Sequence, residues 1–128
     1  MTAILSKQEW VLMEALWANN PLFLSEIIEA TATSVEWNRS SYLTYMKRMK
    51  DKGLIGYRTV RGNRRYFPLV NREDCIEQET NYILSKLTGD GTRLLLASMI
   101  EKSGLSAKDR DELLELIKRL GGLSKAGS

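Results

Sequence analysis

The amino-acid sequence predicts a mainly α-helical protein that carries one small β-hairpin, an α+β architecture in two parts. Three short helical patterns and a hairpin pattern occupy residues 1–71. Three further helical patterns occupy residues 72–122, and a tail that we expect to be flexible follows at 123–128. A chain of 128 residues can form one medium domain or two small ones, and these patterns predict two.

The bulk composition is that of a soluble globular protein, with 43% hydrophobic and 27% charged residues. No apolar run approaches the roughly 20 residues that span a bilayer, so we expect no membrane insertion. The N-terminus has no basic-then-apolar export signal, and the single cysteine, Cys75, excludes an internal disulfide. Both features favour a cytoplasmic location.

Enzymatic chemistry is not expected, because the chain contains no histidine. Histidine is the commonest general base, the usual partner of a nucleophilic serine or cysteine, and a common zinc ligand. The glycines form neither a P-loop nor a GxGxxG turn, and the acidic residues are scattered along helical surfaces. We therefore predict no catalytic activity, no metal and no cofactor.

The net charge of +3 is distributed very unevenly along the chain. Residues 38–66 carry nine lysines or arginines and one acid, which gives this segment a net charge of +8. Residues 1–37 have a net charge of −4, and residues 67–128 have a net charge of −1. A solvated surface normally mixes its charges, so the basic segment favours binding to a polyanion.

The first two helices are predicted from capping residues and apolar spacing. Ser6, with Glu9 three positions later, forms a capping box, and the Asn-Asn-Pro run at 19–21 ends the helix. The apolar face of this helix, expected in the core, comprises Trp10, Met13, Leu16 and Trp17. A shorter helix is expected over residues 24–30, capped by Ser25. Its inward-facing residues are Ile27 and Ile28.

The third predicted helix, over residues 38–53, has one apolar face and one basic face. At about 100° per residue, the apolar side, expected to join the core, comprises Tyr42, Tyr45, Met46 and Met49. The opposite side comprises Arg39, Ser40, Leu43, Thr44, Lys47 and Lys50, with Arg48 at its edge. Gly53 is a typical C-cap glycine. Leu43 is the one apolar residue on the polar side. It reads DNA, contacts the second helix, or is a chance exposed leucine.

Residues 54–70 predict a β-hairpin, because two β-branched and aromatic runs flank Gly62-Asn63, a two-residue turn signal. Pro68 suits the end of an edge strand. Four arginines crowd the tip although no turn requires them: Arg58, Arg61, Arg64 and Arg65. Three helices followed by a basic hairpin is the order of a winged helix-turn-helix, whose third helix enters the DNA major groove while the hairpin, or wing, lies along the backbone.

The C-terminal half predicts a helix from residue 72 to the Gly-Asp-Gly run at 89–91, with Ile76, Ile83 and Leu87 at helical spacing. A second helix, at 92–102, is apolar nearly all round and needs burial on several sides. A third begins at the N-cap Ser106 and ends at Gly121-Gly122. We favour burial against a second copy of the chain over packing onto the N-terminal domain. The predicted dimerisation residues are Ile83, Leu87, Leu95, Leu96, Met99, Ile100, Leu113, Ile117 and Leu120.

The exposed residues of the third helix and wing receive predicted roles in binding double-stranded DNA. Phosphates are expected to meet the long basic side chains Arg39, Lys47, Arg48, Lys50, Arg61, Arg64 and Arg65. Base reading belongs to the first turns of the helix, at Ser40, Ser41, Leu43 and Thr44. Leu43 can touch a thymine methyl group. The alternative is a winged-helix protein-interaction module whose basic face binds an acidic protein partner.

Four stretches carry a family resemblance. They are LSKQEWVLMEALW at 5–17, EIIEA at 26–30, KRMKDKGLIGY at 47–57 after Trp37, and RRYFPLV at 64–70. With the spacing of LLLASMIEKSGLS in the C-terminal half, they resemble the penicillinase-repressor family (BlaI/MecI/CopY) of winged-helix bacterial transcriptional repressors. The resemblance implies a homodimeric repressor that binds a palindromic operator and dimerises through its C-terminal helices.

The matching recognition helix lacks the two basic residues of the family pattern. Family members typically read Trp-Ser-Pro-Lys-Thr-Ile-Arg-Thr-Leu, whereas residues 37–45 read Trp-Asn-Arg-Ser-Ser-Tyr-Leu-Thr-Tyr. Ser40 replaces the usual lysine and Leu43 the usual arginine, while Thr44 remains. We therefore expect a different operator sequence.

The resemblance also implies two ways of ending repression, and the chain departs from both. In antibiotic-responsive members a membrane sensor-protease, a further expected partner, triggers cleavage of an Asn-Phe bond that aligns here with Ser98-Met99. In copper-responsive members a C-terminal cysteine cluster senses metal, whereas Cys75 is single and far from the C-terminus. Ser98-Met99 is thus a candidate regulatory cleavage site whose residues differ from the family's Asn-Phe pair. We expect Cys75 to be a passive helix residue.

Overall fold

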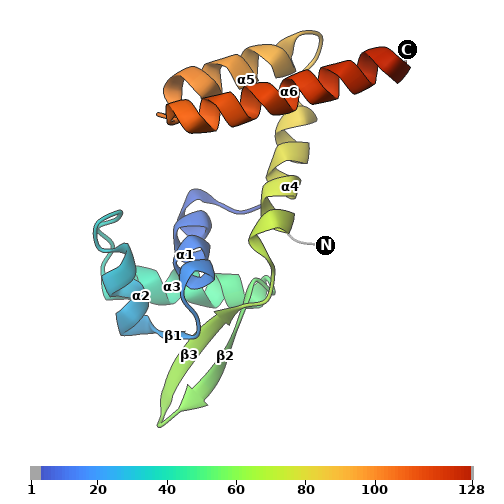
Figure 1. Ribbon diagram of the computed structural model, residues 1–128. Coiled ribbons are helices and arrows are strands. Elements are labelled where there is room, and N and C mark those ends of the chain that lie inside the picture. Colours follow the sequence, from blue (N-terminus) through green and yellow to red (C-terminus); the bar gives the residue numbers. More distant parts are fainter. Residues whose placement is uncertain (1–3, 128) are drawn as a thin grey trace. The chain divides into compact units, whose positions relative to one another are not determined.

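The computed structural model describes residues 4–127, with the side chains of residues 4–119. Its elements, in chain order, are α1 (Lys7–Ala18), β1 (Leu22–Phe23), α2 (Leu24–Thr31), α3 (Arg39–Asp51), β2 (Ile55–Val60), β3 (Asn63–Pro68), α4 (Arg72–Leu84), α5 (Gly91–Lys102) and α6 (Ala107–Gly127) (Figure 1). The chain divides into two compact units between Ser85 and Lys86. The predicted α+β class, with a winged helix-turn-helix and a hairpin wing, is confirmed.

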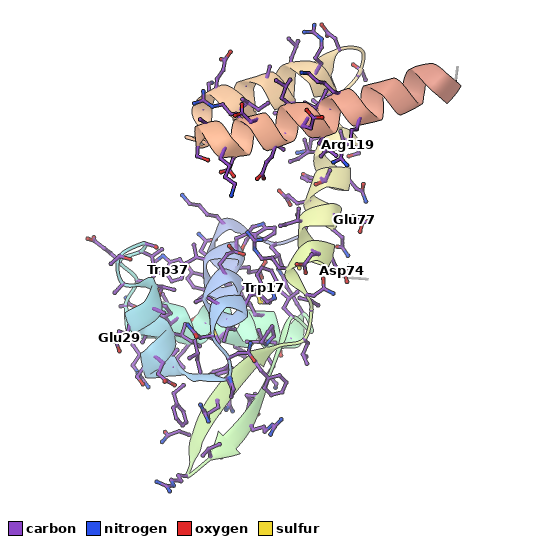
Figure 2. The ribbon with its side chains drawn as sticks, in the orientation of Figure 1. Trp17, Glu29, Trp37, Asp74, Glu77 and Arg119 are labelled. Carbon is purple, nitrogen blue, oxygen red and sulfur yellow. The ribbon has the colours of Figure 1, made fainter. Side chains whose placement is uncertain are left out.

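The first unit has one apolar core to which every one of its elements contributes. Its buried residues are Leu5, Leu12, Met13, Leu16, Leu24, Ile27, Tyr42, Met46, Met49, Leu54, Ile55, Tyr66 and Cys75. Trp10 and Trp17 cover the edge of this core, with their rings 6.0 Å apart in an edge-to-face arrangement. The Trp17 indole N–H donates to the carbonyl oxygen of Val70 at 2.9 Å, which ties α1 to the end of the hairpin (Figure 2).

Helix α1 begins and ends where the sequence predicts. The Ser6 N–H donates to Glu9 Oε1 at 2.8 Å, and the Glu9 N–H donates to Ser6 Oγ at 3.2 Å, so both halves of the capping box are present. The helix ends at Ala18, before the Asn-Asn-Pro run. This reciprocal pairing satisfies two backbone donors that a helix start otherwise leaves without partners.

Helix α2 begins earlier than its predicted cap. Phe23 occupies the N-cap position, and the Glu26 carboxylate accepts its N–H at 2.8 Å. Ser25 lies inside the first turn, so its predicted capping role is wrong. The sequence also missed β1, because a strand of two residues is too short to show the alternation that identifies strands.

The three strands form an antiparallel sheet in the order β1-β3-β2. Val60 pairs with Asn63, so the two-residue turn is Arg61-Gly62 and lies one residue earlier than predicted. Both turn residues have positive φ, 51° at Arg61 and 81° at Gly62, as a type I′ hairpin turn requires. Pro68 ends the central strand rather than the predicted edge strand, which is possible because β1 does not extend along β3 as far as Pro68.

Helices α3 and α4 complete the first unit. Of the predicted core face of α3, Tyr45 packs at the edge and the other three residues are buried. Asn38 caps the start of α3, and Gly53, with φ of 77°, follows its end as expected. The side chain of Cys75 is buried, so the start of α4 packs into the core of this unit. Burial, and secondly the charge of Asp74, raises the pKa of the Cys75 thiol, which disfavours the reactive thiolate.

The second unit contains α5 and α6 and leaves much of its apolar surface uncovered. None of the described residues of α5 is buried, and Leu96 and Met99 are 51% and 50% exposed. Leu113 and Ile117 on α6 are also exposed. The half-buried members of the predicted dimerisation set are Ile83, Leu87, Leu95 and Ile100. The side chain of Leu120 lies outside the described residues.

The boundaries of the C-terminal helices match the sequence in part. The Ser106 hydroxyl accepts the Asp109 N–H at 3.1 Å, which confirms the predicted N-cap of α6. Its predicted end at Gly121-Gly122 is wrong, because α6 continues to Gly127. Glycine weakens a helix by about 1 kcal/mol but, unlike proline, does not break its hydrogen bonding. Helix α4 ends at Leu84, so Leu87 lies in the connection before α5.

Candidate nucleic-acid interface

Helix α3 presents a short, polar first turn to solvent. The Asn38 side chain accepts the Ser41 N–H at 2.8 Å and fixes the start of the helix. Ser40, Leu43 and Thr44 are exposed, whereas Ser41 is half-buried. The Thr44 hydroxyl donates to the Ser40 carbonyl oxygen at 3.1 Å, so the hydroxyl oxygen remains able to accept a hydrogen bond.

The buried side of α3 is held by aromatic contacts. The Tyr42 hydroxyl forms a short, buried hydrogen bond with the Thr31 hydroxyl, which itself donates to the Ile27 carbonyl oxygen at 2.9 Å. Trp37, labelled in Figure 2, meets Tyr42 and Tyr45 edge to face at 5.2 Å and 4.9 Å. These contacts fix the rotation of α3 about its axis, and so determine which residues face outward.

The C-terminal end of α3 is joined to α1 by an ion pair. Lys52 Nζ lies 2.6 Å from Glu9 Oε2, and Glu9 is buried. Burial alone would raise the pKa of Glu9. The hydrogen bond from Lys52, the bonds from Ser6 and the charge of Lys52 together outweigh burial, so the pKa is lowered below its ordinary value. Lys52, the C-cap residue of α3, is thereby neutralised within the fold.

The wing places a second set of cations beside α3. The Arg64 guanidinium lies over the Tyr57 ring at 4.3 Å, and Lys50 Nζ lies 5.7 Å from the centre of the same ring. Cation–π contact steadies both charges without neutralising them. Arg64 thus connects the wing to the exposed face of the helix.

Two adjacent hollows lie between α3 and the wing. The larger, of about 450 Å³, is lined by Phe23, Leu24, Ser25, Arg39, Leu43, Gly62, Asn63, Arg64 and Tyr66. The smaller, of about 300 Å³, is lined by Leu43, Met46, Lys47, Lys50, Arg64 and Tyr66. Leu43, Arg64 and Tyr66 belong to both, and neither set of lining residues contains an acid. The hollows therefore combine positive charge with one exposed apolar side chain.

Some predicted phosphate-binding and base-reading residues line the two hollows, and others are exposed outside them. Arg39, Leu43, Lys47, Lys50 and Arg64 line the two hollows. Arg48 is exposed on α3, and Arg61 is exposed in the hairpin turn.

Arg65 is used differently from the other arginines. Its Nη2 donates to the Pro21 carbonyl oxygen at 3.2 Å, and its guanidinium lies over the Phe23 ring at 5.0 Å. Its side chain therefore joins the wing to the segment before α2.

Sequence reasoning missed three residues of this surface. Tyr57 supports two of its cations, and Ser25 and Asn63 line the larger hollow. The alternation along β2 and β3 carried a signal for Tyr57, because Tyr57, Arg64 and the buried Tyr66 occupy one face of the sheet. No local pattern marks Ser25, which approaches the wing through tertiary packing.

Other functional features are scarce in the described residues. They contain no group of three or more histidine, cysteine, aspartate or glutamate side chains able to hold a metal. Nor does any helix in this part of the chain have the length and apolarity to cross a membrane. The cleavage candidate lies within α5, where Ser98 is half-buried and Met99 is exposed.

Comparison with known proteins identifies relatives over almost the whole chain. The sequence profile of a family described as "Penicillinase repressor" matches residues 5–119. The chain is 24% identical over 115 residues to proteins called "Methicillin resistance regulatory protein MecI" from Staphylococcus aureus (strain N315) and Staphylococcus epidermidis. The same identity and length hold for the protein of that name from Mammaliicoccus sciuri. Each alignment covers 90% of this chain and 94% of the relative.

Proposed function

This chain belongs to the penicillinase repressor family, and we propose that it acts as a homodimeric repressor that binds a palindromic operator. One observation carries the proposal: α3 and the wing enclose two hollows lined by cations and by no acid. A two-fold dimer would present two copies of this surface, so the operator would be an inverted repeat. Occupancy of the operator would then block the promoter.

The basic side chains are proposed to hold DNA phosphates. Those on α3 are Arg39, Lys47, Arg48 and Lys50, and those on the wing are Arg61, Arg64 and Arg65. Each phosphate neutralised releases counterions, so the affinity for DNA should fall steeply with salt. Arg65 would contribute least, because its guanidinium already bonds to Pro21 and stacks on Phe23.

The base-reading set is proposed to be Ser40, Ser41, Leu43 and Thr44. The serine and threonine hydroxyls can donate to or accept from base edges, and Leu43 can pack on a thymine methyl group. Leu43 is 47% exposed and lies at the junction of the two hollows, which supports a contact with DNA over a structural role.

Cleavage at Ser98-Met99 by a membrane sensor-protease is proposed as the event that ends repression. If a membrane sensor-protease cleaves Ser98-Met99, α5 must first open, because proteases bind extended backbone and this bond lies inside a helix. An exposed methionine with an adjacent half-buried serine gives the bond partial accessibility.

DNA binding is tested by fluorescence anisotropy with the upstream region of the protein's own gene, at two salt concentrations. We expect Arg64→Ala to weaken binding to every sequence and to reduce the slope of log K against log salt by about 0.9, the value for one phosphate. Lys102→Ala, which removes the same charge from α5, is the matched control and should leave the slope unchanged. An Arg64→Ala slope equal to that of the unaltered protein would remove the wing from the DNA interface, and no DNA binding at either salt would favour an acidic protein partner.

A further inference from the structure

The wing carries another hollow on its opposite face. It measures about 340 Å³ and is lined by Asn20, Pro21, Arg58, Val60, Arg65, Phe67 and Pro68. Side chains alternate between the faces of a sheet, and Arg58 pairs with Arg65 next to the pair Tyr57–Tyr66. Since Tyr57 contacts Lys50 of α3, the Arg58–Arg65 pair faces away from α3. This hollow is therefore distinct from the two hollows on the α3 side, and Arg65 is the one residue of the proposed phosphate-binding set that lines it.

Two arginines, Arg58 and Arg65, line this outer hollow, and no carboxylate does. Cross-strand pairing places Arg58 directly opposite Arg65, and like charges in that position destabilise a sheet. The lining contains no acid, and neither arginine forms an ion pair within the described residues. Arg65 Nε is buried without an acceptor, although Nη2 of the same side chain donates to Pro21. The pair thus offers N–H donors and positive charge to a ligand.

The remaining walls of the hollow are apolar. The Phe67 ring lies beneath the Arg58 guanidinium at 5.8 Å, and Pro21, Pro68 and Val60 complete the lining. A volume of about 340 Å³ lies at the small end of ligand pockets. An inorganic anion would satisfy the charges but would leave this apolar surface without a contact.

We propose that the outer hollow binds a small organic carboxylate with a flat apolar body, about the size of benzoate. The carboxylate would accept hydrogen bonds from Arg58 and Arg65, and the apolar body would pack against Phe67 and the two prolines. Charge complementarity selects the carboxylate, and the aromatic wall selects the flat body. The proposal does not depend on DNA binding.

The test is an NMR titration of the full chain with sodium benzoate at constant ionic strength, with benzamide and inorganic phosphate as comparison ligands. We expect saturable shifts at the Phe67 backbone amide and the Arg58 Nε–H, and an affinity for benzoate about tenfold above that for either comparison ligand. Arg58→Leu should weaken benzoate binding by about tenfold or more. Arg64→Leu, which removes the same charge on the α3 side, should change it by less than about twofold.

Three results would overturn the proposal. Equal binding of benzamide would show that the arginine pair is not used, and equal binding of phosphate would show that the apolar wall is not used. An equal loss in Arg58→Leu and Arg64→Leu would reveal general attraction to a basic wing. If Arg58→Leu disturbs the amide shifts of β2 and β3, Arg58→Lys replaces it, because this change keeps the charge but removes the fork that pairs with a carboxylate. Unchanged benzoate affinity in Arg58→Lys would then contradict the proposal.

Discussion

Tyr57 organises the basic surface of this protein by holding two cations on one ring. Arg64 lies 4.3 Å and Lys50 5.7 Å from the ring centre. Two like charges so close would repel, and the negative face of the ring offsets part of that repulsion. Since no acid lines the hollow that both cations share, their charge stays available for a polyanion. At the scale of single residues, Tyr57 and Leu43 therefore distinguish this surface from an ordinary basic patch.

Leu43→Ala should change sequence preference and leave folding unaltered. The side chain is 47% exposed, so its loss creates no cavity. We expect affinity for the preferred operator to fall by about 1 kcal/mol, with the loss confined to one A·T position, because burying a methyl-bearing surface is worth about this much. Binding assays with operators substituted at one base pair at a time measure this loss at each position. Leu69→Ala, at another exposed leucine outside the hollows, is the control, and an unaltered preference in Leu43→Ala would make Leu43 a chance exposed residue.

Glu9→Gln should destabilise the protein in a pH-dependent way. The pKa of Glu9 is lowered in the fold, so its ionised form stabilises the folded state above its ordinary, unfolded pKa. That contribution is lost as the pH falls through the lowered pKa. We expect a stability loss of about 1–2 kcal/mol at neutral pH that disappears in acid, measured by urea unfolding across pH. Glu14→Gln, in an exposed pair with Arg72, should cost much less, and a pH-independent loss in Glu9→Gln would refute the ion-pair account.

At the scale of elements, the wing combines a strained turn with a charge that we propose binds DNA. Arg61 has φ of 51°, a conformation that costs a residue other than glycine about 1 kcal/mol and that asparagine tolerates better. The Arg61-Gly62 turn thus places a cation at the tip where local backbone preference would favour asparagine. This conflict explains why the sequence placed the turn at Gly62-Asn63, one residue too late.

Arg61→Asn should therefore raise stability and weaken DNA binding. We expect a gain of about 0.5–1 kcal/mol in unfolding free energy from the relieved backbone. We also expect the slope of log K against log salt to fall by about 0.9, the value for one phosphate contact. Thermal unfolding and anisotropy titrations measure the two effects on one sample. A fall in the unfolding free energy would contradict the turn conformation, and an unchanged salt dependence would contradict the proposed role of Arg61.

At the scale of the whole molecule, the described residues of the second unit leave large apolar side chains exposed. Leu94, Leu96, Met99 and Ile117 are each at least half exposed, far more apolar surface than two stable helices normally leave to water. A repressor of this family with such a surface is expected to pair with a second copy.

Leu96→Glu should convert the proposed dimer to a monomer. A buried, unpaired carboxylate in an apolar interface carries a desolvation cost that should raise the dissociation constant about 100-fold or more. Sedimentation equilibrium over a range of protein concentrations measures this shift. Thr92→Glu adds the same charge at an exposed polar position of α5 and should leave the dimer intact. A dimer unaffected by Leu96→Glu would place the interface elsewhere.

The sequence by itself determined the parts of this protein that are specified locally. The Ser6–Glu9 box, the Asn-Asn-Pro break and Gly53 set the limits of two helices through caps and breakers close to them in the chain. The 3.6-residue period separated the buried side of α3 from the side that exposes Leu43. Composition and order then predicted a wing and a basic surface. These features could be predicted from the sequence because each depends on neighbours within about one helical turn.

The tertiary structure alone shows which basic side chains are bonded within the fold and which remain available to a ligand. Lys52 is paired with Glu9 from 43 residues away, and Arg65 bonds to Pro21 from 44 residues away, so neither partner is visible in a local pattern. Packing also created the two-residue strand β1 and placed Arg58 and Arg65 together on the outer face of the wing. Contacts between distant segments select one partner among many of the same chemical type, and that choice depends on the geometry of the folded core.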